Sequence, residues 1–185
     1  NECPVKLTSN NAPETRDVLG TLLLSTLAGH RRYTHVTALR SDGVNPELLG
    51  MTKVASEDSL RRFLARIPED EGCAWLERHN QLCWAPLLTL PWILDADSTV
   101  KPLYGRQEGA VRGYNPQKPG RPSHVYHSFM MAQTRLVMHA EVAPGNKTAG
   151  SHALAPLVRL LARIPRAHWP EMFRADSSFG VDVVM

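Results

Sequence analysis

The fold is decided by Pro91-Trp92-Ile93-Leu94-Asp95-Ala96-Asp97, a short apolar run that ends in two carboxylates. Before this run the apolar residues recur at helical spacing, and after it they follow the shorter period of strands. The run itself predicts a strand. The elements expected after it are strands at residues 123–132 and 135–142, a turn at Pro144-Gly145-Asn146, a helix with apolar residues from Leu154 to Ile164, and a fourth strand at about 171–175. The predicted order is therefore β-β-β-α-β.

Two aspartates stand at landmarks of this order, because Asp97 ends the first strand and Asp176 follows the fourth. In a β-β-β-α-β sheet the first and fourth strands lie side by side, so their carboxyl ends can bring both side chains to one site. Two oxygen ligands a few Å apart suit Mg²⁺ or Mn²⁺, and two such ions about 4 Å apart support phosphodiester cleavage. The alternative is that each Asp simply forms a turn or a helix cap.

Asp95 adds an ambiguity to this metal site. It points to the same side of the strand as Asp97, because side chains alternate with a period of two. It can therefore be a third ligand, a neighbour that orients a ligand, or an exposed edge residue.

Residues 1–88 predict a helical N-terminal region. Apolar residues from Leu19 to Leu27 share one helical face, and Gly29 is the stop signal. Ser56 suits the N-cap of a second helix, and Glu69-Asp70-Glu71 suit the start of a third, where the macrodipole favours negative charge. Residues expected on the buried side of that third helix are Trp75, His79, Leu82, Cys83 and Pro86. We expect this region to bind DNA or to form a homodimer, with simple packing on the core as the alternative.

The connection from Lys101 to Arg121 is long and basic, with Glu108 as its single acidic residue. A loop of this length in a compact domain is usually functional or disordered. Basic and aromatic side chains beside a metal site suit a DNA backbone and an unstacked base, whereas the alternative is a solvated surface loop. A second basic cluster, His30-Arg31-Arg32-Tyr33, is also explained by a charged helix exit. The candidate DNA-binding residues are Arg106, Arg112, Tyr114, Lys118, Arg121, Arg31 and Arg32.

The composition is that of a globular protein, with 43% hydrophobic and 21% charged residues among 185. No apolar run approaches the length of a bilayer span and no export signal is visible, so we expect a cytoplasmic protein without a membrane partner. The net charge of +3 supports nucleic-acid binding only weakly.

Cysteine and histidine do not predict a metal site of their own. The three cysteines lack CxxC spacing and predict reduced, mostly buried thiols. Cys73, His79 and Cys83 do not converge on one helical face, which disfavours zinc. Three other histidines are expected to be sheet residues rather than ligands: His124, His127 and His139.

Seven segments resemble, in order along the chain, bacterial insertion-sequence transposases of the class called DDE domain group one. They are Gly29-His30-Arg31-Arg32-Tyr33, Ser56-Glu57-Asp58-Ser59, residues 94–99, residues 104–110, Gly113-Tyr114-Asn115, Pro144-Gly145-Asn146 and Arg174-Ala175-Asp176-Ser177. The resemblance implies an α+β protein in which residues 89–185 form part of a ribonuclease H-like core. It also implies that Asp97 and Asp176 are the first two catalytic acids and bind Mg²⁺ or Mn²⁺.

Members of that family cut transposon ends and join the freed 3′ hydroxyl to target DNA, so DNA is the expected partner. Their third acid is a glutamate on a later helix. The chain begins with Asn1 and ends in the strand-like run Val181-Asp182-Val183-Val184-Met185, so we expect a fragment that is inactive in strand transfer by itself. One departure is Ser178, where the family usually has Gly; Ser resists a positive φ more than Gly does.

Two other functions remain open from the sequence. One is a non-catalytic DNA-binding remnant, which would bind DNA without needing Asp97. The other is a different ribonuclease H-like nuclease that acts on structured DNA or RNA.

Overall fold

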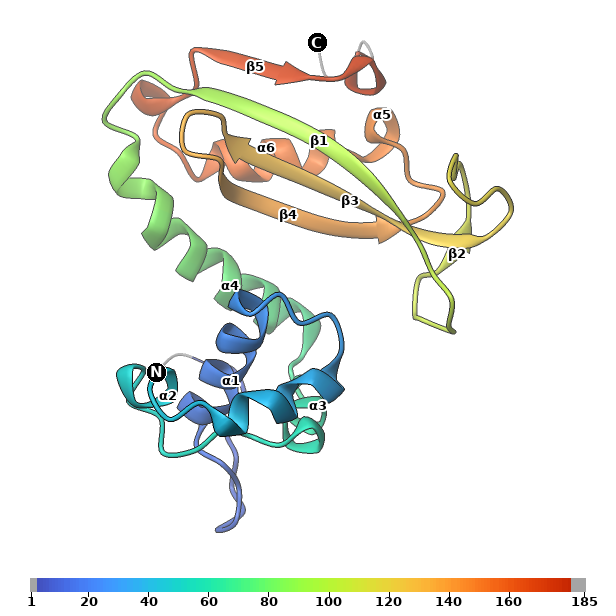
Figure 1. Cartoon of the computed structure of the whole chain (residues 1–185). Coiled ribbons are helices and arrows are strands. Elements are labelled where there is room, and N and C mark those ends of the chain that lie inside the picture. Colours follow the sequence, from blue (N-terminus) through green and yellow to red (C-terminus); the bar gives the residue numbers. More distant parts are fainter. Residues whose placement is uncertain (1–2, 181–185) are drawn as a thin grey trace. The chain divides into compact units, whose positions relative to one another are not determined.

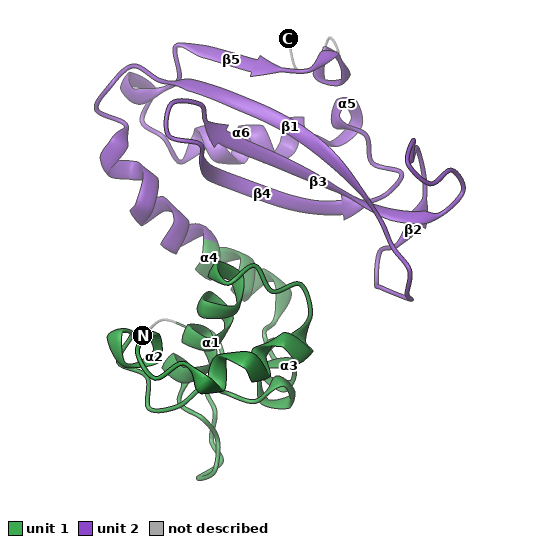
Figure 2. Cartoon of the chain, in the orientation of Figure 1, with its two compact units in different colours: residues 1–76 green, residues 77–185 purple. Residues whose placement is uncertain are grey.

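The computed structural model describes residues 3–180, which form helices in the first part of the chain and a mixed sheet in the second (Figure 1). The chain divides into two compact units, residues 1–76 and 77–185, within α4 (Glu69–Trp84) (Figure 2). None of the helices among the described residues is long and apolar enough to cross a membrane. The strand-like run expected at residues 181–185 lies outside the described part of the chain.

The first unit is helical, as predicted. Ser56 caps α3, because its hydroxyl accepts a hydrogen bond from the N–H of Ser59 at 3.1 Å. Leu60 and Phe63 on the inner face of α3 are each 1% exposed and pack against Val18 of α1. The elements of this unit before α4 are α1 (Thr15–Leu27), the 3-10 helix η1 (Tyr33–Ser41), α2 (Asn45–Leu48) and α3 (Glu57–Leu64).

A buried carboxylate joins α1 to the segment that precedes α3. Asp17 is fully buried and accepts hydrogen bonds from the N–H of Thr52 at 2.8 Å and from its hydroxyl at 2.6 Å. One turn later, the hydroxyl of Thr21 accepts from the N–H of Ala55 at 2.9 Å. A buried charge is tolerated only when its lone pairs are satisfied in this way.

The second unit is built on a mixed sheet. β1 (Ile93–Pro102) pairs antiparallel with β3 (Pro122–Met131) and parallel with β5 (Met172–Ala175). β3 also pairs antiparallel with β4 (Leu136–Pro144) and with the two-residue β2 (Val111–Arg112). Three long antiparallel strands, helices and a parallel return strand confirm the α+β class and the mixed sheet expected from the sequence. β2 was not predicted from the sequence.

β5 forms one edge of this sheet. Among the described residues it pairs only with β1, and all four of its residues are exposed. The helical elements of this unit are the C-terminal half of α4, η2 (Ala85–Leu87), α5 (Ala149–His152), α6 (Leu154–Ala162), η3 (Arg166–His168) and η4 (Ser177–Phe179). Pro156 lies in the first turn of α6, where its missing N–H costs no hydrogen bond.

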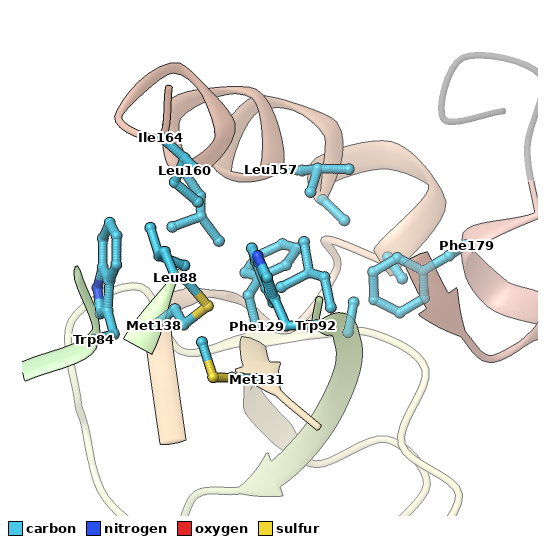
Figure 3. Packing of buried hydrophobic residues seen from close by; sticks show 14 residues of the cluster. Trp84, Leu88, Trp92, Phe129, Met131, Met138, Leu157, Leu160, Ile164 and Phe179 are labelled. Atoms are coloured by element: carbon cyan, nitrogen blue, oxygen red, sulfur yellow. The ribbon is translucent and has the colours of Figure 1, made fainter. Parts of the chain in front are cut away.

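The hydrophobic core lies between the sheet and α6 (Figure 3). Leu94 and Ala96 of β1 and Phe129 of β3 are at most 6% exposed and point to this helix-covered face. From α6, Leu157 and Leu160 pack against them. Because side chains alternate along a strand, the intervening residues of β1 point to the opposite, open face.

The helix-covered face also carries a polar cluster. Glu141 of β4 accepts a hydrogen bond from Nε2 of His152 at 2.7 Å and pairs with Arg159 of α6. His139, 7% exposed, lies 3.7 Å from Glu141 and 3.4 Å from Glu77 of α4. This side of the sheet therefore combines apolar packing with ion pairs.

The buried side of α4 differs from the prediction. Trp75 is half-buried, but four of the residues expected to be buried are exposed: His79, Leu82, Cys83 and Pro86. The inner face combines the fully buried Trp84 with two polar residues: Glu77 pairs with Arg163 at 3.2 Å, and Asn80 donates to the carbonyl of Met138 at 2.8 Å. These partners turn the polar residues inward. The prediction of mostly buried thiols was wrong as well, since Cys73 and Cys83 are exposed.

Candidate functional site

The register of β1 and β5 brings Asp97 and Asp176 to equivalent positions. Ala96 is the partner of Ala175 in the parallel pairing. Asp97 is the next residue of β1, and Asp176 directly follows the last residue of β5. The backbone at Asp176 is still extended, with φ −73° and ψ 174°, so the alternation of side chains continues through it. Neighbouring strands lie about 4.8 Å apart. The two exposed carboxylates therefore lie side by side on the open face of the sheet, where the end of β5 meets the middle of β1.

Each of these carboxylates is oriented by a neighbouring backbone N–H. Oδ1 of Asp97 accepts from the N–H of Ser98 at 2.8 Å. Oδ1 of Asp176 accepts from the N–H of Ser178 at 2.9 Å and from its hydroxyl, so Asp176 also caps η4. Within residues 3–180, Oδ2 of neither aspartate has a hydrogen-bond partner. Capping thus leaves one oxygen of each side chain available for a cation.

Ser178 fits its position without backbone strain. Among the described residues, the non-glycine residue with a positive φ is Arg135, not Ser178. Serine therefore replaces the usual glycine at no conformational cost, and it adds the hydroxyl that binds Asp176.

Asp95 is occupied by an ion pair. Arg174, its register partner on β5, donates from Nε to Oδ1 at 2.6 Å and from Nη2 to Oδ2 at 2.7 Å. The hydrogen bonds from Arg174 lower the pKa of Asp95, and the same contact raises the pKa of Arg174. Both oxygens of Asp95 are engaged, so Asp95 is a neighbour of the acid pair with no free oxygen. Arg174 stands in the segment Arg174-Ala175-Asp176-Ser177 that was quoted from the sequence, but its pairing with Asp95 was not predicted.

The two aspartates are not accompanied by a third ligand in the described part of the chain. Among residues 3–180, no group of three His, Cys, Asp or Glu side chains is placed to hold a metal ion. His127 and His139 face the helix-covered side, where burial lowers the pKa of each imidazole. His124 contacts the carbonyl of Glu108 at 2.8 Å.

The basic loop between β1 and β3 is exposed and locally ordered by its own contacts. The guanidinium of Arg121 lies 4.4 Å from the centre of the Tyr104 ring, a cation–π contact. The predicted DNA-binding residues of this loop are all exposed: Arg106, Arg112, Tyr114, Lys118 and Arg121. Tyr114 is 75% exposed, which leaves its ring available for stacking.

Two glycines allow this loop to pack closely against the turn after β4. A Cβ on Gly113 would lie 1.9 Å from the carbonyl oxygen of Gly145, and a Cβ on Gly145 would lie 2.3 Å from Oγ of Ser123. Only glycine permits this approach of two backbones. The segments 113–115 and 144–146, quoted separately from the sequence, are thus in contact.

Arg31 and Arg32 lie in the first unit and are exposed. They line a surface pocket after α1, together with His30 and Tyr33. These two arginines belong to the helical first unit, and the two aspartates belong to the second unit.

Comparison with protein families gives a match to Transposase DDE domain group 1 over residues 8–185. No curated protein matches the chain. Among solved structures, the Mos1 transposase paired-end complex with left transposon end is 13% identical, with a TM-score of 0.32. The Mos1 mariner paired-end complexes with Mn and with Mg are 11% and 14% identical, with TM-scores of 0.33 and 0.32.

Each of these alignments covers 97–98% of this chain but 58% of the solved one. The chain therefore spans little more than half the length of the transposases it matches. Identities this low do not support a transfer of roles residue by residue.

Proposed function

The chain belongs to the Transposase DDE domain group 1 family, and from that premise we propose that it supplies two of the three acids of a metal-dependent DNA transposase. The observation that supports the proposal is the β1–β5 register, which puts Asp97 and Asp176 side by side on the open face. The proposed reaction is cleavage at the ends of an insertion sequence and transfer of the freed strand to target DNA.

The residues present fit a hard divalent cation. Two carboxylates on adjacent strands, each with one oxygen free of hydrogen bonds within residues 3–180, form the ligand type that Mg²⁺ and Mn²⁺ prefer. Such ions, when bound, activate a water and stabilise the leaving 3′ oxygen. Ser98 and Ser178 hold the other oxygen of each carboxylate, which fixes where the free oxygens point.

The basic loop is the proposed DNA contact of the second unit. Arg106, Arg112, Lys118 and Arg121 would neutralise phosphates, and the exposed ring of Tyr114 would stack on an unpaired base. In the first unit, Arg31 and Arg32 are a second proposed contact. Replacing any one phosphate-binding residue by Ala should reduce the slope of log affinity against log salt by about 0.9.

A third acid is needed to complete the site. The family resemblance implies that it lies on a later helix, and with two aspartates alone water would have to supply the other ligands of the cation. We therefore expect residues 1–185 to bind Mn²⁺ but not to carry out strand transfer on transposon-end DNA with Mg²⁺. Strand transfer by the isolated chain that is lost in Asp97→Ala would contradict this expectation.

Metal binding by the chain tests the assignment of the two acids. Isothermal titration with Mn²⁺ should show a site that disappears in Asp97→Asn and in Asp176→Asn. A matched control is Asp58→Asn, which removes an exposed carboxylate of α3 that pairs with Arg62. Unchanged Mn²⁺ binding in both site variants would overturn the proposal. DNA binding that persists under those conditions would favour the non-catalytic remnant instead.

A further inference from the structure

We propose that the Arg174–Asp95 ion pair is the positioning element of the two-acid site: it locks β5 onto β1 in the register that puts Asp176 beside Asp97, and it keeps Asp95 from binding the metal. The statement about metal binding by Asp95 rests on the proposed function. The statement about the register of β5 on β1 concerns the fold of the chain alone.

The first argument is that β5 is short. The strand has four residues, all exposed, and its register partners on β1 are residues 93–96. On the helix-covered side Phe173 contacts Phe179, and before the strand the N–H of Glu171 donates to the carbonyl of Trp92 at 3.0 Å. Among the described residues, the Arg174–Asp95 pair supplies the side-chain hydrogen bonds that join β5 to β1. A slip of one residue would turn Asp176 to the helix-covered face, and a slip of two would move it about 6.6 Å along the strand.

The second argument is the geometry of the pair. Nε and Nη2 of Arg174 donate to the two separate oxygens of Asp95, at 2.6 and 2.7 Å. A bidentate contact between a planar guanidinium and a carboxylate fixes both distance and orientation, which a single hydrogen bond does not. The pair lies two residues before both aspartates and on the same face, so it acts on their strands directly.

The third argument is the charge of the open face. Asp95, Asp97 and Asp176 would otherwise form a row of three carboxylates. Arg174 neutralises the one that stands out of line with the other two, because it takes up both oxygens of Asp95. The cation is thereby left with the matched pair, Asp97 and Asp176.

Disulfide formation measures the register without any metal. In a background with Cys3, Cys73 and Cys83 changed to Ser, the pair Asp97→Cys and Asp176→Cys lies at adjacent positions of parallel strands, within the Cα separation that a disulfide accepts. Adding Arg174→Ala should slow oxidation to the disulfide by about fivefold, the upper end for an exposed ion pair. Arg174→Lys should slow it as well, because lysine keeps the charge but not the fork.

The matched control is Arg159→Ala. Arg159 is as exposed as Arg174, with 55% of its side chain accessible, and pairs with Glu141 on the other face. It should leave the oxidation rate unchanged. If Arg174→Ala does not fold, Arg174→Lys carries the test. A wild-type oxidation rate in the folded Arg174 variants overturns the inference.

Mn²⁺ titration separates this inference from the proposed function. In the native background, Asp95→Asn should weaken Mn²⁺ binding by about fivefold, and the swap of Asp95→Arg with Arg174→Asp should restore part of it. If the Arg174 variants form the disulfide slowly and the wild-type chain has no Mn²⁺ site, the role of the ion pair in the register is upheld and the metal site is rejected. If the Arg174 variants form the disulfide at the normal rate and the wild-type chain binds Mn²⁺, only the role of the ion pair in the register is rejected.

Discussion

The two faces of the sheet carry opposite kinds of residue from the same strands. On the helix-covered face, Leu94, Ala96 and Phe129 are almost completely buried against α6. On the open face, Asp97 and its partner Asp176 are exposed and polar. Consecutive residues of β1 alternate between these environments. One set of side chains packs in the core, and the other set lies at the proposed metal site. Stability and activity should therefore respond to different substitutions within one strand.

The largest expected effect is on the helix-covered face. Phe129→Ala removes a fully buried ring from the centre of the core. It should lower the free energy of unfolding by about 3–5 kcal/mol, through lost burial and a cavity. Urea denaturation followed by circular dichroism measures this. A loss below about 1 kcal/mol would mean that the two faces do not differ in the way described.

Glu141→Gln should have the next largest effect. The substitution keeps the shape of the side chain but removes the charge that pairs with His152 and Arg159. A loss of about 1–3 kcal/mol is expected where a part-buried polar cluster loses a partner. The open-face counterpart, Asp95→Asn, breaks an exposed pair and should cost at most about 1 kcal/mol. If both substitutions lower the free energy of unfolding equally in the same denaturation experiment, the two faces do not differ in their contribution to stability.

The pH dependence of stability should come from the helix-covered face. Burial is the main cause of the lowered pKa of His127 and His139. The unfolded chain then binds protons at a higher pH than the folded one, so this stability is complete above about 6.5 and is lost as the pH falls toward the folded pKa values.

Urea midpoints at pH 7.5 and pH 5.5 test this, and the midpoint should be lower at pH 5.5. Around His127 the charged groups are His152 and Glu141, whose opposite effects on its pKa are smaller than that of burial. His127→Leu should reduce the difference between the two midpoints. A dependence that is the same in His127→Leu would assign it to other groups.

The smallest effect on stability is expected at the proposed site itself. Asp97→Asn changes an exposed side chain whose hydrogen bond is to the next residue along the chain. The free energy of unfolding should stay within about 0.5 kcal/mol of wild type in metal-free buffer. Its effect should appear only in Mn²⁺ binding. Destabilisation of the metal-free protein by more than about 1 kcal/mol would indicate a structural role for Asp97.

The sequence predicts elements of both units well where residues alternate, recur with a clear period or match a capping pattern. The β1 pattern, the hairpin of β3 and β4, and the capping of α3 by Ser56 follow from local rules. β2 was missed because a strand of two residues has no period to detect. The inner face of α4 was missed because Glu77 and Asn80 are turned inward by distant partners, Arg163 and Met138.

The candidate site also has features that the local sequence predicts and features that depend on residues far apart in the chain. The order of elements predicts that Asp97 and Asp176 follow neighbouring strands, and Asp176 does follow β5 directly. Asp97 does not end its strand, because β1 continues to Pro102 in its pairing with β3. The pairing of Asp95 with Arg174 does not follow from the order of elements, because it depends on a register between residues far apart in sequence. The contact of Gly113 with Gly145 is likewise a product of tertiary structure.

The shortness of β5 also bears on the behaviour of the chain in solution. Its outer backbone amides and carbonyls, unpaired among the described residues, are a template on which a strand from another molecule can add. Four residues offer few hydrogen bonds to such a strand, and a charged arginine stands among them. Self-association along this edge is therefore discouraged by length and by charge, with no helix of residues 3–180 paired to it.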